Sequence, residues 1–220
     1  MRVVFRARLQ AVDSRVNRLT ELVDRAIRDA TDSLLNADLP AAEAVIAADA
    51  VIDAGEGAVE HEVCALITRQ QPVAQDARAL MAALRICACQ QRMGNLAADI
   101  AKATRKRYPD MTIPAELVGV TGDLAEGCFR IVDLMRAALN NQETSAADAM
   151  VAVDADVRRL RREMLTIVTS SALGCSARTA VDATAVSGFY QSFAQEAVQV
   201  GAWVTYRASG PGGHPGIIAR

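Results

Sequence analysis

The sequence predicts an all-α protein of six long helices, arranged as two tandem three-helix bundles related by internal duplication. Apolar residues recur at steps of three, four or seven over stretches of about 25 to 35 residues, as in helices with one solvated face. Aromatic residues make up only 4% of the chain, and alanine supplies much of its 51% hydrophobic content. Strands favour β-branched and aromatic residues, so this composition favours closely packed helices over a sheet.

The first predicted unit spans residues 1–108. Its helices are expected at residues 3–37, 40–69 and 72–107, with Pro40 and Pro72 suited to the first turn of the second and third helices. The residues expected to face inward are, helix by helix, Leu9, Val12, Val16, Leu19, Val23, Ile27 and Leu34; Val45, Ile52, Val59, Val63, Leu66 and Ile67; and Leu80, Leu84, Cys87, Met93, Leu96 and Ile100. Gly55 and Gly57 weaken the second helix by about 1 kcal/mol each relative to alanine, or allow a neighbouring helix to approach closely.

The second predicted unit spans residues 114–208, after a short linker that begins at Tyr108-Pro109-Asp110. Its helices are expected at residues 115–139, 144–171 and 177–207, with a break at Asn140-Asn141. Residues 209–220 are rich in Gly and Pro and are expected to form a flexible tail.

An internal repeat supports the division into two units. Shifts of 105 and 100 residues match similar residues of the two halves: Glu43-Ala44 with Asp148-Ala149, Asp49 with Asp154, Ile52 with Val157, Arg78 with Arg178, Gln91 with Gln191, Ala97 with Ala197, and Ile100 with Val200. Two copies of one three-helix unit explain this pattern.

Composition and charge exclude several classes of protein. The formal charge is -2, without the basic excess of a nucleic-acid-binding domain. The N-terminus carries Arg6, Arg8 and Asp13 where a signal peptide would be apolar, and nowhere are there 18 consecutive apolar residues, so we expect a cytoplasmic protein. The five cysteines show no CxxC spacing and are expected to be buried, reduced thiols: Cys64, Cys87, Cys89, Cys128 and Cys175.

The sequence lacks the motifs of common enzyme classes. There is no G-x-S-x-G elbow, P-loop or G-x-G-x-x-G, and the two histidines, His61 and His214, are far apart. We therefore expect a protein that is not an enzyme.

Three stretches carry a resemblance to a known family. Gln70-Gln71-Pro72-Val73-Ala74 precedes Arg78 at the opening of the third helix, LAADIAK occupies residues 96–102, and EAVQVGAWVTY occupies residues 196–206. Together with the duplicated three-helix pattern, these stretches resemble the PhoU family of phosphate-signalling regulators over nearly the whole chain. The resemblance implies a cytoplasmic adaptor that links the ATPase subunit of a phosphate ABC importer to a sensor histidine kinase, meets the membrane only through its partners, and represses the phosphate-starvation response when phosphate is plentiful.

The family motif, D/E-x-E-R-I-G-D, holds multinuclear metal clusters on each bundle, and this sequence departs from it. The corresponding stretches are CQQRMGN at residues 89–95 and FYQSFAQ at residues 189–195, so every motif carboxylate is replaced. An amide offers a hard cation only a weak, neutral oxygen. We therefore expect no family-type metal cluster at the degenerate positions, which are Gln91, Asn95, Asp99, Gln191, Gln195 and Glu196.

Two alternatives stay open beside the adaptor. The chain could be a metal- or ligand-binding bundle that uses Asp99, Glu43 or Asp49, or a PhoU-like paralogue that serves another partner. The candidates for binding a partner are basic residues: Arg158, Arg159, Arg162, Arg78 and Arg178. A charge run like the one on the fifth helix is also typical of a solvated helix face, here partly neutralised by Asp154, Asp156 and Glu163. The oligomeric state stays open between a monomer and a homodimer.

Overall fold

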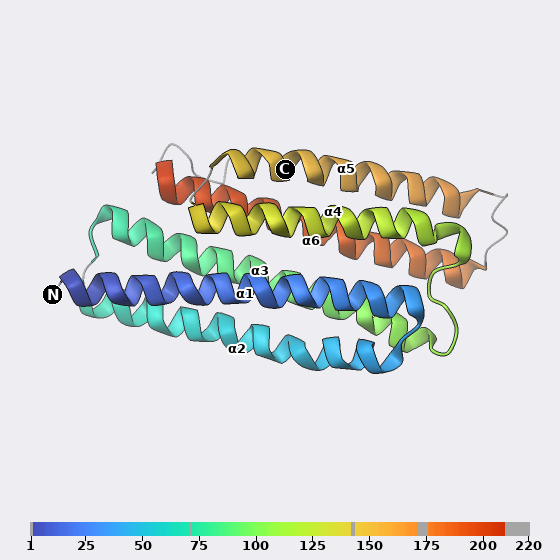
Figure 1. The fold of residues 1–220 in the computed structure, drawn as a ribbon, viewed down its shortest axis with the longest axis horizontal. Coiled ribbons are helices and arrows are strands. Elements are labelled where there is room, and N and C mark those ends of the chain that lie inside the picture. Colours follow the sequence, from blue (N-terminus) through green and yellow to red (C-terminus); the bar gives the residue numbers. More distant parts are fainter. Residues whose placement is uncertain (1, 71, 142–143, 171–175, 210–220) are drawn as a thin grey trace.

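The computed structural model describes residues 2–70, 72–141, 144–170 and 176–209 and consists of six long helices (Figure 1). The helices are α1 (Arg2–Asn36), α2 (Leu39–Gln70), α3 (Ala74–Arg107), α4 (Ala115–Asn141), α5 (Thr144–Thr169) and α6 (Ala177–Ser209). No strand occurs in these ranges, so the predicted all-α, six-helix fold is confirmed. None of the described helices is long and apolar enough to cross a bilayer.

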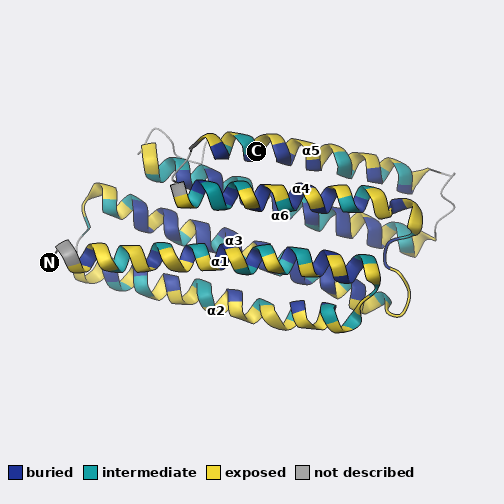
Figure 2. Cartoon of the chain, in the orientation of Figure 1, coloured by how far each residue is buried: buried dark blue, intermediate teal, exposed yellow. Residues whose placement is uncertain are grey.

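The helices form two antiparallel three-helix groups that lie against each other (Figure 1). Helices α1, α3, α4 and α6 make the contact between the groups, through α3 against α6 and α1 against α4. Helix α2 packs on α1 and α3, and α5 packs on α4 and α6, so these two helices lie on the outside of the molecule. Figure 2 shows their long exposed stripes.

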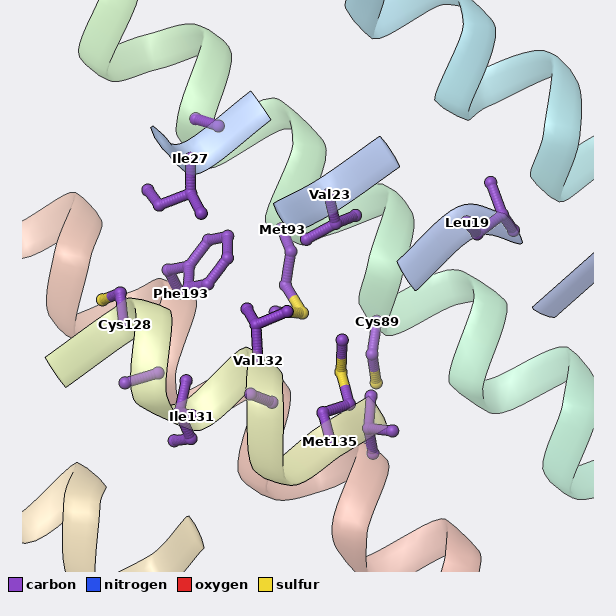
Figure 3. Packing of buried hydrophobic residues seen from close by; sticks show 14 of the residues in the cluster. Leu19, Val23, Ile27, Cys89, Met93, Cys128, Ile131, Val132, Met135 and Phe193 are labelled. Carbon is purple, nitrogen blue, oxygen red and sulfur yellow. The ribbon is translucent and has the colours of Figure 1, made fainter. Parts of the chain in front are cut away.

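The two groups share one hydrophobic core. Side chains from all four inner helices point into the region between the groups in Figure 3, including Ile27 of α1, Met93 of α3, Val132 of α4 and Phe193 of α6. All four are fully buried. Burial of this kind is the main stabilising contribution in a helical protein. The predicted units at 1–108 and 114–208 are therefore joined by apolar packing as well as by the linker.

Burial follows the predicted repeat closely. Every buried residue of α6 falls 100 positions after a buried residue of α3. The first such pair in the sequence is Ala82 with Asp182, and the last is Thr104 with Val204. On the outer helices, buried residues of α2 and α5 match at a shift of 105, as in the pairs Val45 with Met150, Ile52 with Val157, and Val59 with Met164. Most inward-facing positions therefore correspond in the two halves.

Ion pairs also connect the halves. Arg207 of α6 donates to both carboxylate oxygens of Asp13 in α1, at 2.7 and 2.8 Å. Arg107 at the end of α3 pairs with Asp182 at the start of α6 and donates to the carbonyl of Arg178. Both arginines lie in the last turns of their helices.

The turn between α1 and α2 follows the prediction. Ala37 has a φ of 49°, and Asp38 caps α2 by accepting a hydrogen bond from the N–H of Ala41 at 3.0 Å. Gly55 allows close approach, because a Cβ there would lie 2.7 Å from Leu19 Cδ2. Gly57 has open space around it, so it only weakens the helix.

Several details of the prediction were wrong. Ile67 is 44% exposed and points to solvent, because α2 is an outer helix that packs only on α1 and α3, and the buried Leu66 takes the inward-facing position beside it. Cys64 is exposed, whereas Cys87, Cys89 and Cys128 are buried as expected. Helix α4 continues through Asn140-Asn141, so no break occurs there.

Three of the residues expected to face inward pack against the edge of the core and are only half-buried: Leu9, Leu84 and Leu96. Cys175, His214 and the predicted tail, apart from Ser209, lie outside the described residues.

Candidate functional site

Two equivalent surfaces carry the motif residues, one on each three-helix group. The first motif face is formed by α2 and α3, and the second motif face by α5 and α6. The residues of the first motif face are Asp49, Asp53, Glu56, Gln91, Asn95 and Asp99, and those of the second are Asp154, Arg158, Arg161, Gln191 and Gln195.

On the first motif face, the polar groups are engaged with one another across the helix pair. Gln91 of α3 donates from Nε2 to Asp53 Oδ1 of α2 at 2.9 Å. Asp99 accepts from the ammonium group of Lys102 at 2.7 Å. Asn95 is half-buried between them on the same helix, as its spacing from Gln91 predicts. Two of the three aspartates therefore already have a partner within the chain.

Asp49 is the third aspartate of the first motif face, and it lies close to α3. A Cβ placed on Gly94 would lie 3.1 Å from Asp49 Oδ1, so the glycine lets the carboxylate approach the helix backbone. Oδ1 is buried and has no hydrogen-bond partner among the described residues. Burial raises the pKa of Asp49, and the negative charges of Asp53 and Asp99 raise it further, against a smaller lowering by Lys102.

On the second motif face, two arginines take up the polar groups. Arg158 Nη2 lies 2.7 Å from Asp154 Oδ2 on the same helix. Arg161 donates from Nη1 to Gln191 Oε1 of α6, also at 2.7 Å. The guanidinium of Arg161 lies over Gly188, where an added Cβ would be 3.8 Å from Nη2.

Asp154 is the buried carboxylate of this second face, only 4% exposed. Desolvation raises its pKa, and the positive charge of Arg158 opposes that rise. Its other oxygen, Oδ1, is buried without a hydrogen-bond partner in the described part of the chain, like Oδ1 of Asp49. Asp49 and Asp154 thus share the residue type and an unpartnered Oδ1, but their neighbours differ in charge, since Asp49 lies near Asp53 and Asp154 is paired with Arg158.

The two remaining motif positions are neighbours on α6. Gln195 is exposed on the second motif face. Glu196 lies outside both motif faces and accepts from Arg92 Nη2 of α3 at 2.7 Å across the contact between the two groups. Burial raises the pKa of the Cys89 thiol beside this pair to about 12, so this thiol stays protonated.

The arginines proposed as partner-binding residues occupy different environments. Arg158 pairs with Asp154, and Arg159 pairs with Asp156 and Glu163, as the predicted neutralisation requires. Arg162 is exposed and forms no ion pair with a described residue.

The other two candidates, Arg78 and Arg178, lie near the starts of α3 and α6. Arg78 is half-buried and its Nε has no hydrogen-bond partner among the described residues, whereas Arg178 is exposed. The structure does not bring Arg78 to the run on α5, since α3 and α5 are not among the packed helix pairs. Arg178 lies on α6, which packs on α5, but it precedes Gln191, the partner of Arg161, by 13 residues or about 20 Å along the helix.

The sequence did not show which residues pair with the motif glutamines. Asp53 is the partner of Gln91, and Arg161 is the partner of Gln191. The shift of 105 residues that matches Asp49 with Asp154 also places Asp53 on Arg158 and Glu56 on Arg161. Extending the repeat by two helical turns would have shown that these positions change sign between the halves.

Comparison with known proteins identifies the family. The PhoU domain family model matches residues 16–104, which lie in α1 to α3. The chain is 33% identical over 210 residues to the "Phosphate-specific transport system accessory protein PhoU homolog 1" of Mycobacterium tuberculosis, a match that covers 96% of this chain and 95% of the relative. The chain belongs to the PhoU family. A second relative from the same organism, PhoU homolog 2, is 30% identical over 210 residues, covering 96% of this chain and 99% of the relative.

Solved PhoU structures have the same fold. The crystal structure of PhoU from Pseudomonas aeruginosa superposes with a TM-score of 0.87 at 20% identity, covering 94% of this chain and 99% of that one. The phosphate transport system regulatory protein PhoU from Streptococcus pneumoniae superposes with a TM-score of 0.84 at 19% identity, covering 94% and 97%. The helical arrangement is therefore that of PhoU proteins along nearly the whole chain.

The residues present do not fit the metal clusters that the family resemblance implies. A multinuclear cluster of hard cations needs several carboxylates directed at one point. In the described part of the chain, no three His, Cys, Asp or Glu side chains are grouped so that they could hold a metal ion. The first motif face keeps carboxylates, but Asp53 and Asp99 are occupied by an amide and an ammonium group. The second motif face offers one buried carboxylate beside two guanidinium groups.

Proposed function

We propose that this PhoU protein is a regulatory accessory protein of a phosphate importer, and that it acts in the cytoplasm as an adaptor without catalytic activity. Its partners would be the ATPase subunit of the importer and a sensor histidine kinase, and it would repress the phosphate-starvation response at high phosphate. The observation that carries this proposal is the end-to-end match to relatives named as accessory proteins of phosphate-specific transport, with 96% of this chain aligned.

The surface of the molecule supports an adaptor over an enzyme. A hollow of about 480 Å³ between α4 and α5 includes Arg130 and Val153, and one of about 330 Å³ between α1 and α2 includes Arg25 and Ala48. Neither contains a residue of a motif face. Most polar groups of the motif faces are instead paired within the chain, and the two carboxylates with an unpartnered oxygen, Asp49 and Asp154, line neither hollow.

Co-purification from native cells grown in high phosphate tests the proposed partners. The chain is recovered through a removable tag, and bound proteins are identified by mass spectrometry against a mock purification from untagged cells. Recovery of the importer ATPase or a sensor kinase is the expected result. Recovery of neither partner would contradict the adaptor.

A matched pair of variants locates the contact. Arg162 is exposed without an ion pair to a described residue, whereas Arg159 is held between Asp156 and Glu163. If the α5 surface binds an acidic partner, Arg162→Gln lowers recovery of that partner more than Arg159→Gln does. Equal recovery with both variants would place the contact elsewhere on the molecule.

A second candidate function is that of a PhoU paralogue that serves a different partner. The observation in its favour is the loss of the motif carboxylates, with arginines on the second motif face. Enrichment of one unrelated protein in the same co-purification, with the importer ATPase absent, would support this candidate and exclude the first.

The third candidate, a metal- or ligand-binding bundle, rests on the first motif face. Of its three candidate carboxylates, Glu43 pairs through Oε2 with Arg105 Nη1 at 3.5 Å, and Asp99 pairs through Oδ1 with Lys102 Nζ at 2.7 Å. The third, Asp49, keeps Oδ1 without a hydrogen-bond partner among the described residues. Metal analysis of protein purified without an affinity tag tests this candidate, because near-zero stoichiometry would exclude a resident metal.

A further inference from the structure

We infer that Arg158 and Arg161 supply the positive charge of the second motif face in place of metal cations, so that this face is assembled without metal and takes up none. The inference concerns the chemistry of the second half of the chain and does not depend on which partner the protein binds.

The register of the repeat places both arginines on positions that are acidic in the first half. Arg158 corresponds to Asp53 and Arg161 corresponds to Glu56, while Asp154 corresponds to Asp49. Buried residues on either side fix this register: Val45 with Met150, Ile52 with Val157, and Val59 with Met164. The sign of the charge has therefore been inverted at two positions of a helix whose packing is otherwise preserved.

Asp154 requires a cation, and Arg158 provides it. A carboxylate that is 4% exposed is costly to keep ionised unless a positive charge or hydrogen bonds compensate for the lost water. Arg158 reaches it at 2.7 Å while its own side chain remains 45% exposed. A metal ion bound to the other oxygen, Oδ1, would lie beside this guanidinium and near a second positive charge, that of Arg161, and both would repel it.

The hydrogen bonds of the two motif glutamines provide a second, independent observation. Gln91 acts as a donor, from Nε2 to the carboxylate of Asp53. Gln191, at the equivalent position, acts as an acceptor through Oε1 for the guanidinium of Arg161. An amide can serve either role, so the same residue type fits a face with a carboxylate and a face with a guanidinium. Asp53 corresponds to Arg158 and Glu56 to Arg161, so the two glutamines bond neighbouring positions of the outer helix, and each takes the role that the charge on its own face allows.

Manganese binding by the full chain, with any tag removed, tests the exclusion of metal. Mn²⁺ prefers oxygen ligands, and the electron paramagnetic resonance signal of the free ion measures how much is bound. Asp154→Asn is expected to leave the amount of bound Mn²⁺ unchanged, whether or not Asp49→Asn on the first motif face lowers it. A chelator is expected to leave the melting temperature of the wild type unchanged. A loss of bound Mn²⁺ on Asp154→Asn would overturn the inference, as would a chelator-induced fall in melting temperature that Asp154→Asn abolishes.

The role of the guanidinium is tested by a matched pair of neighbours. Arg158→Gln should lower the melting temperature by at least ~2 °C relative to Arg159→Gln, because Arg159 pairs only with exposed carboxylates. Adding Asp154→Asn should recover most of that loss, since the buried charge is then removed. Arg158→Lys keeps the charge and serves if Arg158→Gln does not fold. Equal melting temperatures for Arg158→Gln and Arg159→Gln would overturn the inference.

Discussion

Close packing of α5 against α6 predicts that an added methyl group at Gly201 destabilises the protein. A Cβ at this position would lie 2.9 Å from Met150 Sδ, 3.1 Å from Ala147 Cβ and 3.2 Å from Ala147 Cα. The methionine can move, because its side chain is long and flexible. The backbone of Ala147 cannot move without separating the two helices, so Gly201→Ala must push α6 away from α5.

The magnitude follows from two opposing terms. Replacing glycine by alanine inside a helix stabilises it by about 1 kcal/mol. Overpacking a well-filled site costs about 1–3 kcal/mol. Gly57→Ala is the matched control, since nothing lies within 4 Å of a Cβ at that exposed position of α2. We therefore expect Gly57→Ala to gain about 1 kcal/mol, and Gly201→Ala to fall below it by about 1–3 kcal/mol.

Urea unfolding followed by far-ultraviolet circular dichroism measures both variants against the wild type. In a thermal melt, the difference between them corresponds to roughly 2–4 °C per kcal/mol for a chain of this size. Gly201→Ala as stable as Gly57→Ala would refute the packing of α6 on α5 described above.

Two further predictions concern buried groups of the shared core. Tyr190→Phe removes a buried hydrogen bond of 2.8 Å to Thr31 and should lower the free energy of unfolding by about 1 kcal/mol, whereas Tyr108→Phe, at an exposed position, should have little effect in the same urea titration. Burial raises the pKa of Cys87 and of Cys89 to about 12, so above the ordinary thiol pKa of 9.0 the unfolded chain holds fewer protons than the folded one, and stability must fall as pH rises from there toward 12. Between about pH 8 and about pH 10, the wild type should lose more free energy of unfolding than the double variant Cys87→Ala/Cys89→Ala, by up to about 1.4 kcal/mol per pH unit for each thiol. Equal losses in the two proteins would show that the thiols ionise in the folded protein.

Periodicity predicted the helices well because each has one continuous apolar stripe. The stripe of α1, from Val12 to Leu34, is buried throughout. Errors occurred at the edges of stripes and at helix ends, as with Ile67, which is apolar but exposed. The sequence could not show that α3 and α6 are buried on more than one side, because alanine and glycine at close helix contacts add little to a hydrophobic pattern.

The candidate site was predicted only in part. The amides Gln91 and Gln191 were found through the repeat, but their partners were not, because hydrogen bonding between helices depends on the angle at which the helices pack. The run on α5 was predicted as a solvated face, and for Arg159 the structure shows that environment. Arg158 and Arg161 lie on the side of α5 that faces the motif residues, whereas Arg159 lies on the solvated side. The register that matches Asp49 with Asp154 is the sequence signal that distinguishes Arg158 and Arg161 from Arg159.

Expression of a phosphate-starvation reporter tests the proposed regulatory role most directly. The strain should lack this chain and every other PhoU homologue, and should be grown in high phosphate. We expect constitutive expression of the reporter in this strain and return of repression when the chain is restored. Normal repression in the strain without the chain would contradict a role in phosphate signalling.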